Sequence, residues 1–148
     1  MKKYNYILIF LFTIANNSFS QIGKEVNMND LAKKSDGMFY LYQNSKFTLY
    51  TGTAYRLYPN GNKWSVWEIK NGISIRFLMY SNSGKIIQEE NFNLKKQYSG
   101  KYFSGNEKGD TLNLGVYKKG IKEGKWIIIN PDSTKSIIYY KKGVPIIK

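Results

Sequence analysis

The side chains best suited to catalysis are missing from this chain. It contains no histidine and no cysteine, which excludes histidine acid–base catalysis, thiol chemistry and the common zinc sites. Glu89 and Glu90 are the only adjacent carboxylates, and neighbours on a strand point to opposite faces, so they make a poor general acid–base pair. No Ser-Lys arrangement offers an activated nucleophile. We therefore expect a non-enzymatic protein, without catalytic residues, metal ion or cofactor.

Aromatic side chains are the remaining candidates for a site, since they make up 16% of the chain. Large rigid rings contribute strongly to binding energy at interfaces. The rings that we predict to contact a partner are Tyr55, Tyr58, Trp64 and Tyr80. Trp67 and Trp126 share strand faces with aliphatic residues, so we expect both to be buried. Tyr58 is the better candidate for an exposed ring.

Positive charge is the second candidate feature, because 23 Lys and Arg outnumber ten Asp and Glu. One interpretation is an anionic partner such as an acidic glycan, lipid head groups or an acidic protein. The other is that lysines fill turns and keep strand edges soluble. Their position in turns favours the second: Lys95, Lys96, Lys118, Lys119, Lys141 and Lys142. No helix-turn-helix, zinc-finger or RNA-binding pattern occurs, so nucleic acid is an unlikely partner.

An internal repeat of about 23–25 residues predicts the elements that position these side chains. From Tyr50 onward, each unit ends in an apolar residue followed by a turn signal: 69–72, 92–96, 117–120 and 140–143. Each unit is one hairpin that cannot bury its apolar face alone, so neighbouring units stack side by side. The sequence therefore predicts an all-β fold over residues 38–148: a meander of repeated β-hairpins forming one elongated open sheet.

Individual strands follow from alternation and turn residues. A strand over 53–58 is closed by Pro59–Asn62, whose Asn-Gly pair tolerates positive φ. Residues 73–80 alternate in polarity, as a half-buried strand does. The Gly-rich segment 105–110 is expected to interrupt the third unit. Pro145 indicates that the last segment is an edge strand.

The first twenty residues have the anatomy of a signal peptide. Lys2 and Lys3 precede an apolar run over 6–15, and Ser18 and Ser20 are spaced for cleavage before Gln21. The run is too short to cross about 30 Å of hydrocarbon. We expect export to the periplasm or beyond the cell. Cleavage lowers the formal net charge from +13 to +11, because two lysines leave (13 − 2). Residues 21–37 are expected to form a leader with at most a helical turn or two.

Several of these segments resemble a known repeat family. The motifs are Asp36-Gly37-Met38-Phe39-Tyr40, Tyr58-Pro59-Asn60-Gly61, Glu123-Gly124-Lys125-Trp126 and Tyr140-Lys141-Lys142-Gly143. Together they resemble MORN-variant repeat proteins, a group that includes YwqK-type antitoxins of toxin–antitoxin systems. The resemblance covers about residues 36–143 and implies a MORN-like sheet that binds proteins or membrane surfaces, with no catalytic residues.

Two functions remain open on this reasoning. The first is a protein-binding module of the cell envelope, antitoxin-like, that holds its partner on one sheet face. The second is a surface protein that binds acidic glycan or lipid through rows of lysines and aromatic rings, in which case salt would weaken binding.

Overall fold

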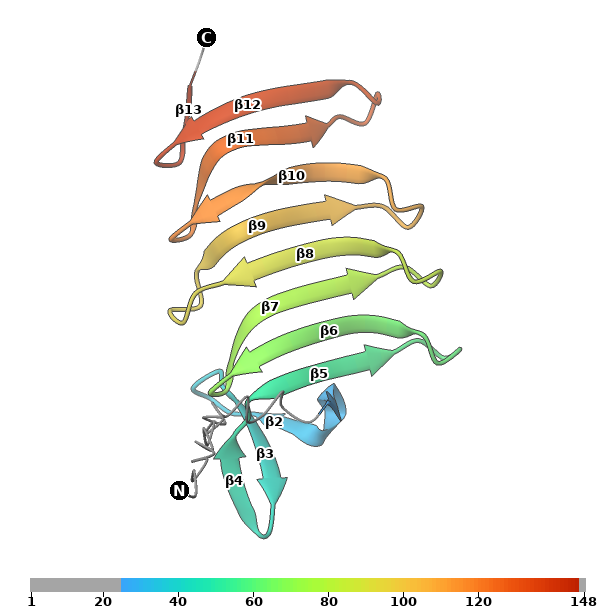
Figure 1. Ribbon diagram of the computed structural model, residues 1–148, viewed down its shortest axis with the longest axis vertical. Coiled ribbons are helices and arrows are strands. Elements are labelled where there is room, and N and C mark those ends of the chain that lie inside the picture. Colours follow the sequence, from blue (N-terminus) through green and yellow to red (C-terminus); the bar gives the residue numbers. More distant parts are fainter. Residues whose placement is uncertain (1–24, 147–148) are drawn as a thin grey trace, which may run out of the picture.

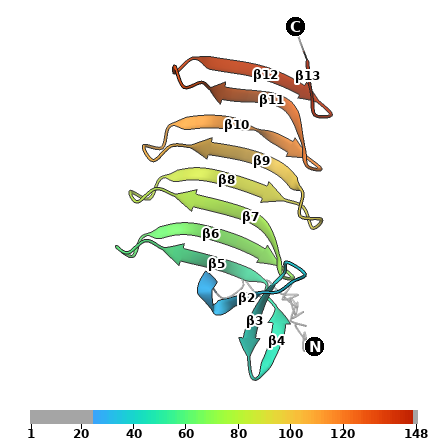
Figure 2. The same cartoon turned by 180° about the vertical axis from the view of Figure 1, so that it is seen from behind.

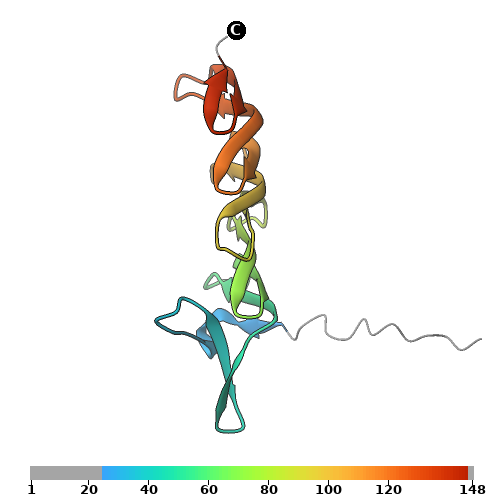
Figure 3. The ribbon, with the colours of Figure 1, turned by 90° about the vertical axis from the view of Figure 1, so that its left-hand side faces the viewer.

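The computed structural model describes residues 25–146, so the predicted signal peptide at 1–20 lies outside the described residues. Strands dominate these residues, and the sheet does not close on itself. Seen from either broad side, the strands of the repeats cross the long axis of the molecule one above another (Figures 1 and 2). Seen edge-on, the repeats form a single layer (Figure 3). The predicted open meander of hairpins is confirmed.

The long sheet has ten strands in the order β1-β5-β6-β7-β8-β9-β10-β11-β12-β13. Every pairing from β5 to β13 is antiparallel, whereas β1 (Val26–Asn27) lies parallel to β5 (Gly52–Leu57). The other strands are β6 (Lys63–Lys70), β7 (Ile73–Tyr80), β8 (Ile86–Phe92), β9 (Tyr98–Gly105), β10 (Thr111–Lys118), β11 (Ile121–Ile129), β12 (Lys135–Lys141) and β13 (Val144–Ile146).

A second sheet adds to the single one that the sequence predicts. It contains β2 (Leu31–Lys33), β3 (Phe39–Gln43) and β4 (Lys46–Leu49) in that order. Backbone bonds join it to the first repeat turn: Phe39 N–H donates to the Gly72 carbonyl at 2.8 Å, and Gly72 N–H donates to that of Tyr50 at 2.7 Å. The opening hairpin therefore belongs to a separate small sheet that contacts the long one.

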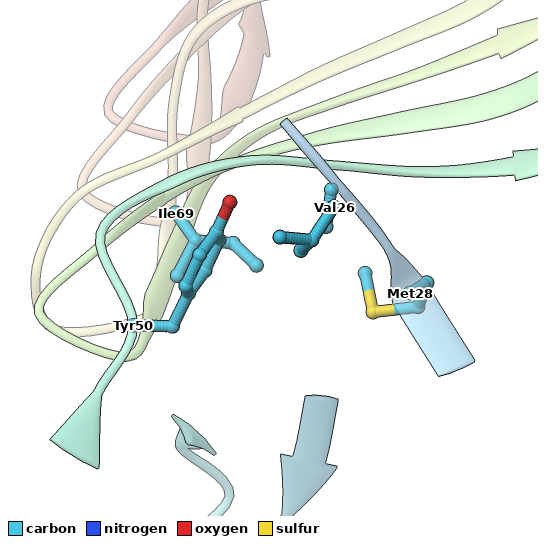
Figure 4. Close-up of a cluster of buried hydrophobic side chains, with 5 residues drawn as sticks. Val26, Met28, Tyr50 and Ile69 are labelled. Carbon is cyan, nitrogen blue, oxygen red and sulfur yellow. The ribbon is translucent and has the colours of Figure 1, made fainter. Parts of the chain in front are cut away.

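Residues 26–33, which the sequence placed in a leader, are part of the fold. They form β1, the short 3-10 helix η1 (Met28–Asp30) and β2. Val26 and Met28 are buried together with Tyr50, Ala54 and Ile69 (Figure 4). This cluster fills the junction of the two sheets, because a single layer has no second layer to cover its apolar side chains.

Two kinds of turn connect the repeats. Two-residue turns at Asn71-Gly72, Lys119-Gly120 and Lys142-Gly143 have positive φ at both positions, which matches the right-handed twist of the flanking strands. Five longer turns share another pattern of backbone hydrogen bonds. The N–H group of the first residue donates to the carbonyl of the fifth, and the N–H group of the fourth donates to the carbonyl of the first. These turns span 58–62, 81–85, 93–97, 106–110 and 130–134.

The interruption expected at 105–110 is absent, so this prediction is wrong. Gly105 still belongs to β9, and Asn106–Asp110 forms the same turn as its counterparts in other units. Asn106 Oδ1 accepts from the N–H groups of Lys108 and Asp110, both at 3.0 Å, as Asn93 Oδ1 does from Lys95 and Gln97. Asparagine begins three of the five turns, at positions 93, 106 and 130, whereas Tyr58 and Ser81 begin the other two, so asparagine favours this turn without being required for it.

Candidate partner-binding surface

Three of the four predicted contact residues lie together where β5, β6 and β7 reach their turns. The Tyr58 hydroxyl donates to the Tyr80 carbonyl at 2.8 Å, and the rings of Tyr58 and Trp64 are 6.5 Å apart between centroids. All three side chains are half-buried. The expectation that Tyr58 is exposed is therefore wrong: its ring lies against Trp64 and its hydroxyl joins two neighbouring hairpins.

Tyr55, the fourth predicted contact residue, is half-buried and lies apart from these three, next to a lysine. The Nζ atom of Lys63 lies 5.6 Å from the centre of the Tyr55 ring, and Val66 is its partner on β6. The four predicted residues thus do not make one exposed patch. Their contacts connect strands of the first repeats and leave little of the rings exposed for a partner.

The two tryptophans expected to be buried differ in exposure. Trp126 is 1% exposed, and its indole N–H donates to the Val116 carbonyl at 3.2 Å, so that prediction is confirmed. Trp67 is only half-buried, although it packs against the junction cluster and lies 5.1 Å from the Phe77 ring. The difference arises because Trp126 has rings around it on the neighbouring strands, whereas one side of Trp67 borders a cavity.

Six rings follow one another across β8 to β12 and form what we call the aromatic column. Successive ring centres lie 4.9 to 6.2 Å apart, within the range of stacked and edge-to-face pairs. Its members are Phe92, Tyr98, Tyr102, Tyr117, Trp126 and Tyr140. On a single-layer sheet these large rings cover one another, which supplies the packing that a second layer would otherwise give.

Gly115 makes the middle of the aromatic column possible. Its position on β10 faces Tyr102 on β9, and a Cβ atom there would lie 2.2 Å from Cδ2 of Trp126. The indole ring of Trp126 therefore lies directly over the backbone of β10. This glycine is explained by close approach of a ring, not by turn geometry.

The aromatic column also contains tyrosines whose pKa is raised, Tyr98 and Tyr117. Burial raises the pKa of Tyr98 to about 12, with a further contribution from the nearby Glu90 carboxylate, which accepts its hydroxyl at 3.2 Å. Burial likewise raises the pKa of Tyr117. Both of these phenols are therefore neutral at physiological pH.

The opposite face of the sheet exposes aliphatic side chains at its C-terminal end. Residues on a strand alternate between faces, so Leu114 and Val116 lie opposite Gly115, and Ile137 lies opposite Ile138. The exposed fractions in this set run from 38% to 66%. We call five aliphatic residues and the ring of Tyr139 the aliphatic patch, whose members are Leu114, Val116, Ile137, Tyr139, Val144 and Ile146.

Lysines lie beside residues of the aliphatic patch as their register partners. Lys101 is paired with Val116, Lys125 with Tyr139, and Lys141 with Val144. Register partners project from the same face of a sheet, so each ammonium group borders an apolar side chain. All three lysines are exposed.

A shallow cavity of about 240 Å³ lies between the small and long sheets. Phe39, Trp67 and Phe92 form its apolar wall, and Lys33 and Lys96 add positive charge. The Lys96 ammonium donates to the Asp36 carbonyl at 2.8 Å, so this side chain ties the two sheets together beside the cavity. The cavity thus borders a structural junction.

Within residues 25–146, no three Asp or Glu side chains are placed to hold a metal ion. In the same part of the chain, no helix has the length and apolar character needed to cross a lipid bilayer.

Comparison with protein-family models finds no match for this chain, and no curated protein matches it.

Sequence reasoning missed both the aromatic column and the aliphatic patch. The sequence signal was the alternation of side chains along two strands. Leu112 and Leu114 alternate with Asn113. In residues 136–140, Ile137 and Tyr139 lie on one face, and Ile138 and Tyr140 lie on the other. The prediction considered only aromatic rings as contacts and therefore selected residues that connect neighbouring hairpins, such as Tyr58 and Tyr80. It did not ask which aliphatic side chains remain exposed.

Proposed function

We propose that this chain is an exported, non-enzymatic repeat protein that binds a protein partner in the cell envelope, in the manner of the antitoxin-like MORN-variant proteins that its motifs resemble. The long sheet serves as a rigid support, and its exposed side chains make the contacts. Export follows from the signal-peptide anatomy of the first twenty residues.

The aliphatic patch is the observation that carries this proposal. Six large apolar side chains, all at least 38% exposed, lie on one face of the sheet, on β10, β12 and β13. Contiguous exposed apolar surface of this kind marks interaction sites in proteins that remain soluble as monomers. Its burial against a partner would supply the binding free energy.

A capture experiment tests the proposal. The mature protein, residues 21–148, is immobilised and exposed to an envelope extract of the cells that produce it, at low and at high salt. We expect one protein to be retained at both salt concentrations. A triple variant, Ile137→Thr with Val144→Thr and Ile146→Thr, removes apolar groups while keeping β-branched side chains, and should lose that protein.

The matched control replaces exposed aliphatic residues elsewhere. Leu57 and Ile86 are 45% and 42% exposed but lie on β5 and β8, so Leu57→Thr with Ile86→Thr should retain the captured protein. Loss of all capture at high salt, or equal loss in the control variant, would argue against an apolar protein interface.

A second function, binding of acidic glycan or lipid, is favoured by one feature of the other face. The Lys122 ammonium lies 4.4 Å from the centre of the Trp126 ring and 5.2 Å from that of Tyr140. A cation beside the half-buried Tyr140 ring is an arrangement that suits an anionic sugar, whereas the Trp126 ring is itself buried. Binding to this face would be lost at high salt and would be unaffected by the triple threonine variant.

A further inference from the structure

The geometry points to a partner segment whose carboxylates alternate with apolar side chains and which lies across the aliphatic patch. This inference rests on the proposed function and specifies the face that binds and the chemistry of what it binds. Three features of the patch carry it: its aliphatic composition, the position of its lysines and the state of its nearby carboxylate.

The lysines are cross-strand neighbours of apolar patch residues: Lys101 lies on β9 at one side of the patch, Lys125 lies on β11 between its strands, and Lys141 ends β12. Lys101, Lys125 and Lys141 are each directly across a strand pair from a patch residue. A partner that covers Val116, Tyr139 and Val144 must therefore also cover or meet three ammonium groups. Burial of an unpaired charge costs free energy, so a complementary partner places a carboxylate opposite each one.

One carboxylate, that of Glu123, stands beside the patch against its three lysines, and a hydrogen bond to a backbone N–H leaves its negative charge in place. Glu123 faces Val116 across β10 and β11, and its Oε2 accepts the backbone N–H of Lys142 at 2.8 Å. Among residues 25–146, the ion pairs involve Lys63 and Arg76, not the three patch lysines. The patch therefore presents net positive charge to whatever contacts it.

A second copy of this chain does not fit that surface. The whole chain carries a formal net charge of +13, and each copy would bring its own three lysines to a shared patch. Like charges at close range oppose association, and Pro145 on the terminal strand removes a backbone donor that an added strand would use. The charge on both sides favours an acidic partner over self-association.

A membrane surface is also a poorer match than a protein segment. Insertion of Val116 and Tyr139 into hydrocarbon would draw in Lys101 and Lys125, which lie at the same level of the sheet. Alternation of ammonium and aliphatic groups is matched by alternation in a partner chain, whose side chains can be placed one by one.

Selection from a random peptide library tests this inference. Twelve-residue peptides displayed on phage are selected on the mature protein at 0.1 M salt, with counter-selection on the triple threonine variant. Synthetic versions are then measured by fluorescence anisotropy. We expect the selected peptides to be rich in Asp and Glu interleaved with Leu, Ile or Phe.

Two charge variants of equal net charge separate patch recognition from general attraction. Lys101→Gln with Lys125→Gln and Lys141→Gln should weaken peptide binding about tenfold, as loss of several surface ion pairs of a few tenths to 1 kcal/mol each predicts. Lys46→Gln with Lys70→Gln and Lys95→Gln removes three exposed lysines outside the patch and should change binding less than about twofold.

The possible outcomes are distinct. Carboxylate-poor peptides that still require the patch would overturn this inference and leave the protein-binding proposal intact. Equal weakening by the two lysine variants, or failure to select any peptide, would overturn it as well. So would patch-dependent binding to vesicles of phosphatidylcholine with 30% phosphatidylglycerol in place of peptide binding, which would assign the patch to a lipid surface.

Discussion

Buried serines show how single residues contribute to a sheet with little interior. Ser65 and Ser81 are 1% and 2% exposed, and they are the buried polar side chains of the described residues. Ser81 Oγ accepts from Lys85 N–H at 3.1 Å and contacts Ser83 Oγ at 2.9 Å. Ser65 Oγ has no hydrogen-bond partner in residues 25–146. The two side chains are similarly buried, but only the hydroxyl of Ser81 makes hydrogen bonds.

Substitution of each serine by alanine should therefore have opposite effects. Ser81→Ala should lower the free energy of unfolding by about 1–2 kcal/mol, because a buried backbone donor loses its acceptor. Ser65→Ala should leave it unchanged or raise it by up to about 1 kcal/mol, because a buried unpaired hydroxyl is removed. Urea unfolding measures both, and a larger loss in Ser65→Ala than in Ser81→Ala would contradict the assignment.

The phenol of Tyr98 makes stability depend on alkaline pH. Its pKa is about 12 in the folded chain, against 10 for an ordinary tyrosine, so the unfolded chain ionises first as pH rises. The stabilisation is complete below pH 10 and is lost between about pH 10 and 12, by about 2–3 kcal/mol in all. Tyr98→Phe should unfold less steeply over that range, as followed by circular dichroism. An identical pH slope in both proteins would show that this phenol is not protected.

At the scale of elements, the two-residue turns offer a test of how the small sheet is attached. Gly72 and Gly120 occupy the second position of equivalent turns, with φ of 75° and 85°. A Cβ atom on Gly72 would lie 2.7 Å from Leu49 Cδ2 and 3.0 Å from the Phe39 carbonyl oxygen. On Gly120 it would meet Gln97 Cβ at 3.7 Å, which is ordinary contact.

Alanine substitutions at these two glycines should separate the cost of backbone strain from the cost of steric overlap with the small sheet. Gly120→Ala should cost about 1 kcal/mol, from positive φ alone. Gly72→Ala should cost that amount plus about 1–3 kcal/mol of overpacking against the small sheet. Thermal unfolding of the two variants gives the difference. Equal costs would mean that the small sheet moves away from this turn at little expense.

The repeat strands were predictable because each carries its own local signals. Apolar alternation and turn residues recur in every unit, so β5 to β12 follow from short windows of sequence. The small sheet was not predictable in the same way. Its place depends on backbone bonds between Phe39, Tyr50 and Gly72, residues far apart in sequence, and no periodicity records them.

The candidate surface was harder to predict than the fold, for a related reason. In a single-layer sheet both faces meet solvent. Alternation shows which residues share a face, but it does not show on which face the side chains cover one another. Tyr117 and Tyr140 have neighbouring rings to cover them, whereas Val116 and Ile137 have short side chains that do not cover one another. The predicted Tyr55 lies on the same face as Leu114, because successive register partners from β5 to β10 connect them, but its ring is half-buried. The exposed residues of that face lie at its C-terminal end, and most of them are aliphatic.

As a whole, the molecule combines a packed aromatic side with an open aliphatic side on one extended sheet. The long narrow shape seen in Figures 1 and 3 presents both sides to solvent along the repeats. A formal net charge of +13 opposes association of such a sheet with itself. We propose that Lys101, Lys125 and Lys141, beside residues of the aliphatic patch, favour an acidic partner.

The most direct test of protein binding by this face is site-specific photocrosslinking in the cells that produce the protein. A photoreactive phenylalanine analogue is placed on β12 at position 137, in the aliphatic patch, or at position 140, in the aromatic column. We expect one discrete protein adduct from position 137 and none from position 140. Adducts from position 140 alone, or labelling of lipid or glycan without a protein adduct, would contradict it.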